Sequence, residues 1–377
     1  MLLPIGLEFV AVFIATLLMI WALEPMAHRL GLLDHPAGRK QHEAPTPFHG
    51  GLAIFIGMLV MVALIPDPSP RLQALVLAGG LLVVVGVLDD LHDVHWTWRI
   101  LAQIAAALIL VHVGGVRIEQ IGPVFGLAPM SLGQFSVPFT VFATVGLINA
   151  LNMADGIDGL AGSLVLAALL MLAGAAAWAG NERLLHGLVL VAGAVLAFLV
   201  FNLRRPGLLR ARVFLGNAGS ALLGLVIAWA AFRLTQNPGH PVSPVLAPFL
   251  IAPPVIDCLV LIARRLRMGR SPFAADRGHM HHHFLDAGFG VGGTVLVITS
   301  VSLLLGGLAA IALLLKVPQQ AFVGVFLGLC AGWYALTAKR SRAVGVLGRL
   351  RALLAAVPVV GHMVGPPPRH QHGATTR

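Results

Sequence analysis

The chain has 377 residues, of which 58% are hydrophobic and 11% are charged, and its formal net charge is +10. Soluble domains carry about 25% charged residues, so this composition excludes an ordinary soluble protein. The apolar runs are continuous and lack the alternation of a transmembrane β-barrel, and they therefore predict an all-α, polytopic membrane helix bundle.

Eleven apolar segments follow one another, each near the roughly 20 residues that cross a bilayer. They span residues 3–23, 48–65, 74–88, 99–113, 136–151, 160–179, 185–201, 213–231, 244–263, 292–314 and 319–337. The first is expected to be a membrane span and not a removed signal peptide, because it lacks a charged n-region and a small-residue cleavage site. We expect one integral membrane domain over 1–337 and a basic cytoplasmic tail over 338–377, helical at first and then disordered.

The loops between these segments differ sharply in charge. If the segments alternate in direction, one side holds 20 of the 25 Lys and Arg residues. The other side holds Arg71, Arg117, Arg183, Arg233 and Lys316. By the positive-inside rule the basic side is cytoplasmic, with the N-terminus outside and the C-terminus in the cytoplasm. No basic, aromatic-rich soluble domain is present, so nucleic-acid binding is not expected.

Carboxylates gather at the predicted cytoplasmic ends of two segments. Together with two asparagines at i, i+3 spacing, they are Asp89, Asp90, Asn149, Asn152, Asp155 and Asp158. Neighbouring carboxylates that are partly dehydrated repel each other unless a cation or proton intervenes. A helix cap or a polar seam would account for each group alone, whereas the whole set on one membrane face indicates a functional site. Oxygen ligands of this kind suit Mg²⁺, with Mn²⁺ as an alternative.

Two further loops supply groups that recognise anions. Residues 264–283 contain Arg264, Arg265, Arg267, Arg270, Arg277, His279, His281, His282 and His283. Guanidinium groups match phosphate oxygens, and consecutive histidines on a helix cannot all face one ion, so phosphate recognition is favoured over a zinc site or a packing role. In residues 212–224, Gly216, Gly219 and Ser220 suit either an anion contact or a simple helix start.

Five motifs occur in order on the predicted cytoplasmic face. They are GLLDHPAGRKQHEAPTPFHGG, GVLDD, NALNMADGIDGL, VFLGNAGS and RRLRMGRSPFAADRGHMHHH. Together, from about residue 30 to 290, they resemble the polyprenyl-phosphate N-acetylhexosamine-1-phosphate transferases. The last loop resembles the WecA-like branch more closely than the MraY-like enzymes of peptidoglycan synthesis.

This resemblance implies an enzyme of the bacterial inner membrane whose active site faces the cytoplasm. It implies transfer of N-acetylglucosamine-1-phosphate, or a related N-acetylhexosamine-1-phosphate, from a UDP-sugar to undecaprenyl phosphate, with release of UMP. The product would start a lipid-linked cell-surface polysaccharide such as O-antigen. A muramyl-pentapeptide-phosphate transferase is an alternative. A lipid-sugar flippase is a further one, although it predicts polar groups near the bilayer midplane and on both faces. A homodimer is implied by resemblance alone.

The resemblance also assigns roles to residues that match its motifs. The catalytic acids are Asp89, Asp90, Asp155 and Asp158, of which the first two position or deprotonate the lipid phosphate. The Mg²⁺ ligands are Asp90, Asn152 and the residue at 217. The sugar nucleotide is held by Asn149, Arg265, Asp276, Arg277, His279, His281 and His282, and the first cytoplasmic loop adds Asp34 and Lys40. Because a lipid phosphate needs no base at neutral pH, direct attack is favoured over a covalent aspartyl intermediate.

One position departs from the pattern of the resembled family. The chain has Asn217 in VFLGNAGS, where the resemblance implies an aspartate that binds Mg²⁺. The amide keeps a carbonyl oxygen but loses the negative charge, so we expect weaker metal binding and slower turnover. An engineered substitution, compensation by nearby acids or substrate phosphates, and a weakened homologue each account for this residue.

Overall fold

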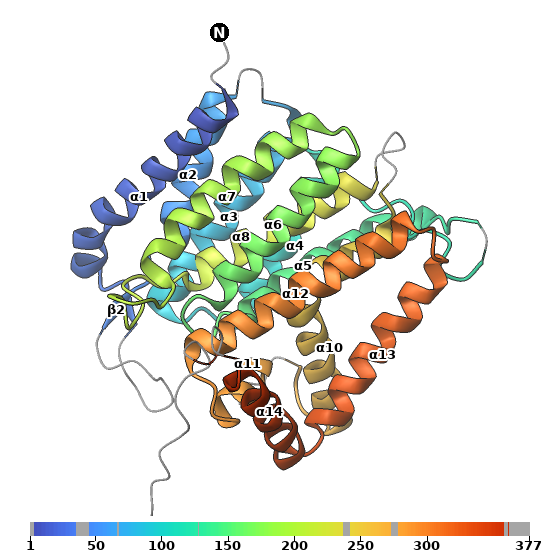
Figure 1. Cartoon of the computed structure of the whole chain (residues 1–377). Coiled ribbons are helices and arrows are strands. Elements are labelled where there is room, and N and C mark those ends of the chain that lie inside the picture. Colours follow the sequence, from blue (N-terminus) through green and yellow to red (C-terminus); the bar gives the residue numbers. More distant parts are fainter. Residues whose placement is uncertain are drawn as a thin grey trace, which may run out of the picture.

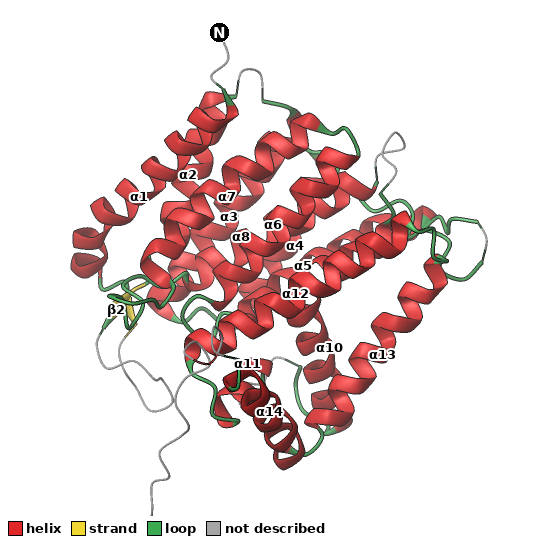
Figure 2. Ribbon diagram, in the orientation of Figure 1, coloured by secondary structure: helices red, strands yellow, loops and turns green. Residues whose placement is uncertain are grey.

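The computed structural model describes residues 4–34, 45–65, 68–126, 128–236, 242–272, 278–357 and 361. Helices dominate these residues (Figures 1 and 2), and the sheet within them consists of strands β1 (Leu33–Asp34) and β2 (Thr46–Pro47), paired antiparallel. The prediction of an all-α membrane protein is therefore confirmed.

Eight helices in the described part of the chain are long and apolar enough to cross a membrane. They are α1 (Ile5–Leu30), α3 (Pro70–His92), α5 (Ser136–Ala154, preceded by the 3₁₀ turn η1, Gly133–Phe135), α6 (Leu160–Trp178), α7 (Glu182–Asn202), α8 (Gly216–Thr235), α12 (Val291–Leu314) and α13 (Gln319–Thr337). The shorter apolar helices α2 (Gly50–Leu64) and α4 (Trp96–His112) occupy two more predicted segments. Each of the eleven predicted segments contains a helix, whereas the number of crossings and their direction stay predictions.

The predicted segment 244–263 is not one straight helix. It forms the 3₁₀ turn η2 (Pro244–Leu246), the short helix α9 (Ala247–Leu250) and helix α10 (Ala252–Arg267), with a bend of 87° at the break. Ile251 interrupts the helix with φ −138° and ψ 40°, and Pro253 and Pro254 follow, which have no backbone N–H to continue it. Apolar composition alone does not change across this break, so hydropathy did not reveal it.

Helix α10 leads to a small group of helices at one end of the molecule. It packs against α13, and the short helix α11 (Met280–Asp286) packs against α14 (Arg340–Ala355), as Figure 1 shows. Helix α14 forms the start of the predicted basic tail. Residues 358–360 and 362–377 lie outside the described residues, so disorder in that part of the tail stays a prediction.

Helix α8 lies at the centre of the bundle, and 94% of its most apolar 18-residue stretch is buried. Glycines let its neighbours approach closely: a Cβ on Gly86 of α3 would lie 2.3 Å from the Cα of Ala218, and one on Gly51 of α2 would lie 2.2 Å from the nitrogen of Gly219. Such positions admit no side chain without moving a backbone. Helices α2 and α3 therefore meet α8 at its first turns.

We expect Gly86→Ala to destabilise the protein, because the added methyl group would push α3 away from α8. The expected loss is about 1–3 kcal/mol, typical of overpacking in a close-packed interior. Gly146→Ala on α5 is the matched control, since a Cβ there meets nothing within 4 Å. Thermal unfolding of both variants in detergent measures the difference, and equal melting temperatures would contradict this account of the α3–α8 contact.

Candidate active site

Asp90 caps the first turn of α8. The backbone N–H of Asn217 donates to Asp90 Oδ1 at 3.0 Å. Gly216 has a positive φ of 73°, and a Cβ there would lie 2.6 Å from Asp90 Oδ2, so only glycine leaves room for the carboxylate. Asp90 Oδ2 is buried and has no hydrogen-bond partner among the described residues. A buried anionic oxygen in this state calls for a cation or a proton.

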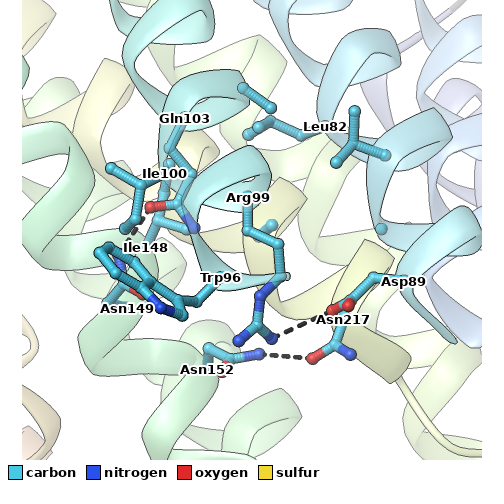
Figure 3. A pocket seen from close by; sticks show the side chains of 14 residues that line it. Leu82, Asp89, Trp96, Arg99, Ile100, Gln103, Ile148, Asn149, Asn152 and Asn217 are labelled. Carbon is cyan, nitrogen blue, oxygen red and sulfur yellow. Dashed lines mark hydrogen bonds and ion pairs between the residues drawn. The ribbon is translucent and has the colours of Figure 1, made fainter. Parts of the chain in front are cut away.

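Asn152 of α5 connects this turn to a second helix. Its side-chain N–H groups donate to Asn217 Oδ1 and to Ser220 Oγ, both at 2.9 Å. Figure 3 shows the two asparagine side chains facing each other beneath Arg99. The side-chain oxygen of Asn217 thus faces Asn152 inside the polar cluster, while the backbone N–H of the same residue contacts Asp90.

A narrow pocket of about 60 Å³ opens beside this cluster, between α3, α4, α5 and α8. Its apolar wall includes Leu82, Val85, Ile100, Ile148 and Ala221, and its polar end consists of Asp89, Arg99, Asn152 and Asn217 (Figure 3). The guanidinium of Arg99 donates to the buried Asp89 at 3.1 Å. The pocket therefore offers a cation at its end and hydrocarbon along its side.

Asn149 lines the narrow pocket too. Its amide donates to Gln103 at 2.6 Å and to the backbone carbonyl of Val145 at 2.8 Å. The contact with Gln103 holds the side chain against α4, whereas Val145 belongs to α5 itself. Asn149 is not among the residues that line the larger cleft described next, and its predicted contact with the sugar nucleotide stays a prediction.

A larger cleft of about 700 Å³ lies on the other side of the cluster. Its polar lining includes Asp34, Asp89, Asp90, Asn152, Asp155, Asp158, Arg204, Asn217 and His282. Asp89, Asn152 and Asn217 line both cavities, so these three side chains form a shared wall between them. Of the two residues predicted in the loop before α2, Asp34 reaches the cleft from β1, whereas Lys40 lies outside the described residues.

The two acids after α5 have different surroundings. Asp158 Oδ2 accepts a hydrogen bond from Arg204 Nε at 2.7 Å and from the backbone N–H of Ala211 at 3.0 Å, and so holds the loop between α7 and α8. Asp155 stands directly after α5 in the cleft. Loss of hydration, together with the nearby charges of Asp90 and Asp158, raises the pKa of Asp155 to about 7.

The histidines do not all face the cleft. His282 lines it, whereas His281 is buried against Gly156, where a Cβ would lie 2.3 Å from the His281 ring. The ring of His281 stacks on the ring of His279, with 5.7 Å between the ring centroids. Burial holds the pKa of His281 well below its usual range, so this ring is neutral at pH 7. His282 is therefore the histidine best placed to meet a ligand.

Arg265 is buried, with 2% of its surface exposed, and donates to the backbone carbonyl of Pro272 at 2.5 Å. This contact fixes the start of the loop that leads to the histidines. Asp276 and Arg277, predicted to bind the sugar nucleotide, lie outside the described residues. No site role was predicted for Arg99 or Arg204, because their pairing with Asp89 and Asp158 arises from tertiary contacts. Their position in the sequence, close to the acidic ends of apolar segments, could have pointed to them.

The comparisons with known proteins agree with this architecture. Residues 72–235 match glycosyl transferase family 4. The undecaprenyl-phosphate alpha-N-acetylglucosaminyl 1-phosphate transferase of Escherichia coli is 33% identical over 311 residues, which cover 82% of this chain and 84% of that protein. Proteins of the same name from Yersinia pestis and Haemophilus influenzae are also 33% identical, over 86% and 88% of this chain and 89% and 94% of their own lengths.

The membrane helices and the similarity to known transferases together identify this protein as a membrane-bound transferase. The chain belongs to glycosyl transferase family 4, in its WecA-like group of undecaprenyl-phosphate N-acetylglucosaminyl-1-phosphate transferases. The predicted family is confirmed, and the muramyl-pentapeptide alternative is not favoured.

We expect Asp155→Asn to stabilise the metal-free protein increasingly as pH rises. A pKa of about 7 in the folded state, against about 4 in the unfolded state, means that the folded protein holds this proton more tightly. The free energy of unfolding of the unsubstituted protein therefore falls between about pH 4 and pH 7, and the amide removes that loss.

Melting temperatures in EDTA at pH 5, 6, 7 and 8 measure this difference. The advantage of Asp155→Asn should grow across the series and level off above about pH 7. Asp158→Asn is the control: it weakens the contact with Arg204 and should lower the melting temperature at every pH. A pH-independent effect of Asp155→Asn would show that the pKa of Asp155 is not raised.

Proposed function

We propose that this protein transfers N-acetylglucosamine-1-phosphate from UDP-N-acetylglucosamine to undecaprenyl phosphate and releases UMP. The observation that carries the proposal is the wall of Asp89, Asn152 and Asn217 shared by a narrow, partly apolar pocket and a wide polar cleft. One cavity suits a lipid phosphate and the other a nucleotide sugar. An oxygen of the lipid phosphate would attack the phosphorus attached to the sugar, and the bond from that phosphorus to the UMP oxygen would break.

Arg99 is the group best placed to hold the lipid phosphate. It lies at the polar end of the narrow pocket, and its side chain keeps 39% of its surface exposed while one N–H group contacts Asp89. The other N–H groups of this guanidinium would bind phosphate oxygens in charge-assisted hydrogen bonds. Asp89, already paired with Arg99, would then orient the guanidinium, and a lipid phosphate that is ionised at neutral pH needs no base.

The cluster around Asp90 fits a divalent cation such as Mg²⁺. Asp90 has a buried oxygen without a hydrogen-bond partner among the described residues, and Asn217 adds an amide oxygen that Asn152 holds in place by a hydrogen bond. The described part of the chain contains no group of three or more His, Cys, Asp or Glu side chains that could hold a metal ion by themselves. Mg²⁺ commonly binds through one or two carboxylates plus substrate phosphates and water. When bound, it would offset the negative charge of the diphosphate.

The proposed reaction takes place at the cytoplasmic face of the bacterial inner membrane. The loops that line the cleft fall on the side that carries most of the Lys and Arg residues, which supports this orientation. Asp155, Asp158 and His282 would meet the sugar nucleotide in the cleft. A flippase is less well supported, because the polar groups of both cavities lie at one end of the helices.

We expect Asn217→Asp to lower the Mg²⁺ concentration for half-maximal UMP release by about tenfold, because the carboxylate restores a charge beside Asp90. Purified protein in detergent with undecaprenyl phosphate and UDP-N-acetylglucosamine provides the assay. Asn217→Ala, which removes the side-chain oxygen, should require more Mg²⁺ than the unsubstituted protein.

Equal Mg²⁺ dependence of the three proteins would place the metal away from residue 217. If none of them releases UMP, other UDP-sugars follow, and silence with all of them would exclude the transferase function for this chain. The rise in melting temperature on adding Mg²⁺ gives a second readout that does not depend on turnover, and it should be largest for Asn217→Asp.

A further inference from the structure

A buried carboxylate outside both cavities holds the histidine helix in place. Asp257 lies in α10, is 5% exposed, and is not among the side chains that line the pocket or the cleft. It accepts hydrogen bonds from three groups: the backbone N–H of Met280 at 3.0 Å, the His279 ring at 3.3 Å and the indole N–H of Trp333 at 3.2 Å. A carboxylate buried this deeply is stable only when its oxygens are satisfied in this way.

These contacts join three separate elements. Met280 is the first residue of α11, where the residue before the helix makes no side-chain cap, so Asp257 supplies from α10 an acceptor that α11 lacks locally. Trp333 adds α13 to the same oxygen. Helix α11 has seven residues and is too short to be stable alone, so its position depends on such tertiary contacts.

The contact with His279 also fixes the orientation of its ring. A carboxylate can only accept, so Nδ1 of His279 must carry the hydrogen that faces Asp257 Oδ2. The His279 ring then stacks on His281 with 6° between the ring planes, and the centroids of His281 and His282 are 4.3 Å apart. The ring centroids of His279 and His282 are 6.3 Å apart, so the three imidazoles form one compact group beside Asp257, and His282 is the member that lines the cleft.

We infer that Asp257 is a positioning residue for the sugar-nucleotide site. It holds the start of α11 against α10 and α13, and through His279 and His281 it sets the direction in which His282 faces the cleft. The ligand class is a nucleoside diphosphate sugar, whose phosphates His282 would meet, and to this extent the inference rests on the proposed function. The lipid pocket is built from α3, α4, α5 and α8, so Asp257 should not affect it.

Steady-state kinetics of Asp257→Ala separates positioning from a general loss of structure. We expect KM for UDP-N-acetylglucosamine to rise about tenfold while KM for undecaprenyl phosphate stays within about twofold. Asp257→Asn keeps an acceptor for Met280 and Trp333 but loses the charge facing His279, so its KM should be intermediate. Trp333→Phe removes one donor while keeping an aromatic ring, and it should show the smallest rise.

Asp286→Asn is the matched control at the opposite end of α11. Asp286 pairs with the exposed Arg340 at 2.7 Å, and surface pairs of this kind contribute little. Its kinetic constants should equal those of the unsubstituted protein. Two results would overturn the inference while leaving the proposed function intact. The first is a rise in KM that is equal for the two substrates in Asp257→Ala and in Asp257→Asn. The second is a lower kcat with neither KM changed.

A chemical readout tests the inference independently of turnover. Modification of histidines by diethyl pyrocarbonate, located by mass spectrometry, should label His282 in the unsubstituted protein and spare His279 and His281. Asp257→Ala should raise labelling of His279 several-fold, and Asp286→Asn should not. Unchanged labelling of His279 would overturn the positioning role, whereas UMP release that is absent from the unsubstituted protein would count against the proposed function instead.

Discussion

The contact between Asp90 and the first turn of α8 depends on how closely two helices can approach. Without glycine at position 86, α3 could not lie against Ala218, and without glycine at 216 the carboxylate would meet a Cβ. Close packing therefore creates the polar centre: it buries one oxygen of Asp90 and turns the other to the backbone N–H of Asn217. The two cavities, the arginine at the end of the narrow pocket and the loop after α5 are all arranged around that buried anion.

The charges around this centre are unevenly satisfied. Asp158 contacts Arg204, and Asp89 contacts Arg99 through one oxygen. The other oxygen of Asp89 and Oδ2 of Asp90 are buried without a hydrogen-bond partner among the described residues, and the pKa of Asp155 is raised to about 7. Paired acids hold structure, and acids that lack a partner attract cations. Asp158 thus holds a loop, whereas Asp89, Asp90 and Asp155 keep charge that a cation or proton can offset, although the sequence presents the four acids as two similar pairs.

Hydropathy predicted where the helices lie, because apolar character summed over fifteen or more residues is a strong signal. It missed the bend at Ile251, where composition is constant and only Pro253 and Pro254 mark the change. The spacing of the acids and asparagines pointed to one cluster, and all of these side chains except Asn149 line one cleft, whereas Asn217 was assigned by resemblance. The environments of the histidines could not be predicted, because His279 is oriented by Asp257, 22 residues earlier on another helix. The roles assigned to these residues by resemblance stay predictions.

The wall of Asp89, Asn152 and Asn217 has a thermodynamic consequence. Both cavities use the same three side chains, so an occupant of one alters the field and the hydrogen bonds that an occupant of the other experiences. Two bound anions would repel across this wall, and a cation held there would turn repulsion into mutual support. Linkage requires the effect to be reciprocal: whatever factor the first ligand imposes on the affinity of the second, the second imposes on the first. The order in which lipid and nucleotide arrive would then change the path to the ternary complex but not its stability.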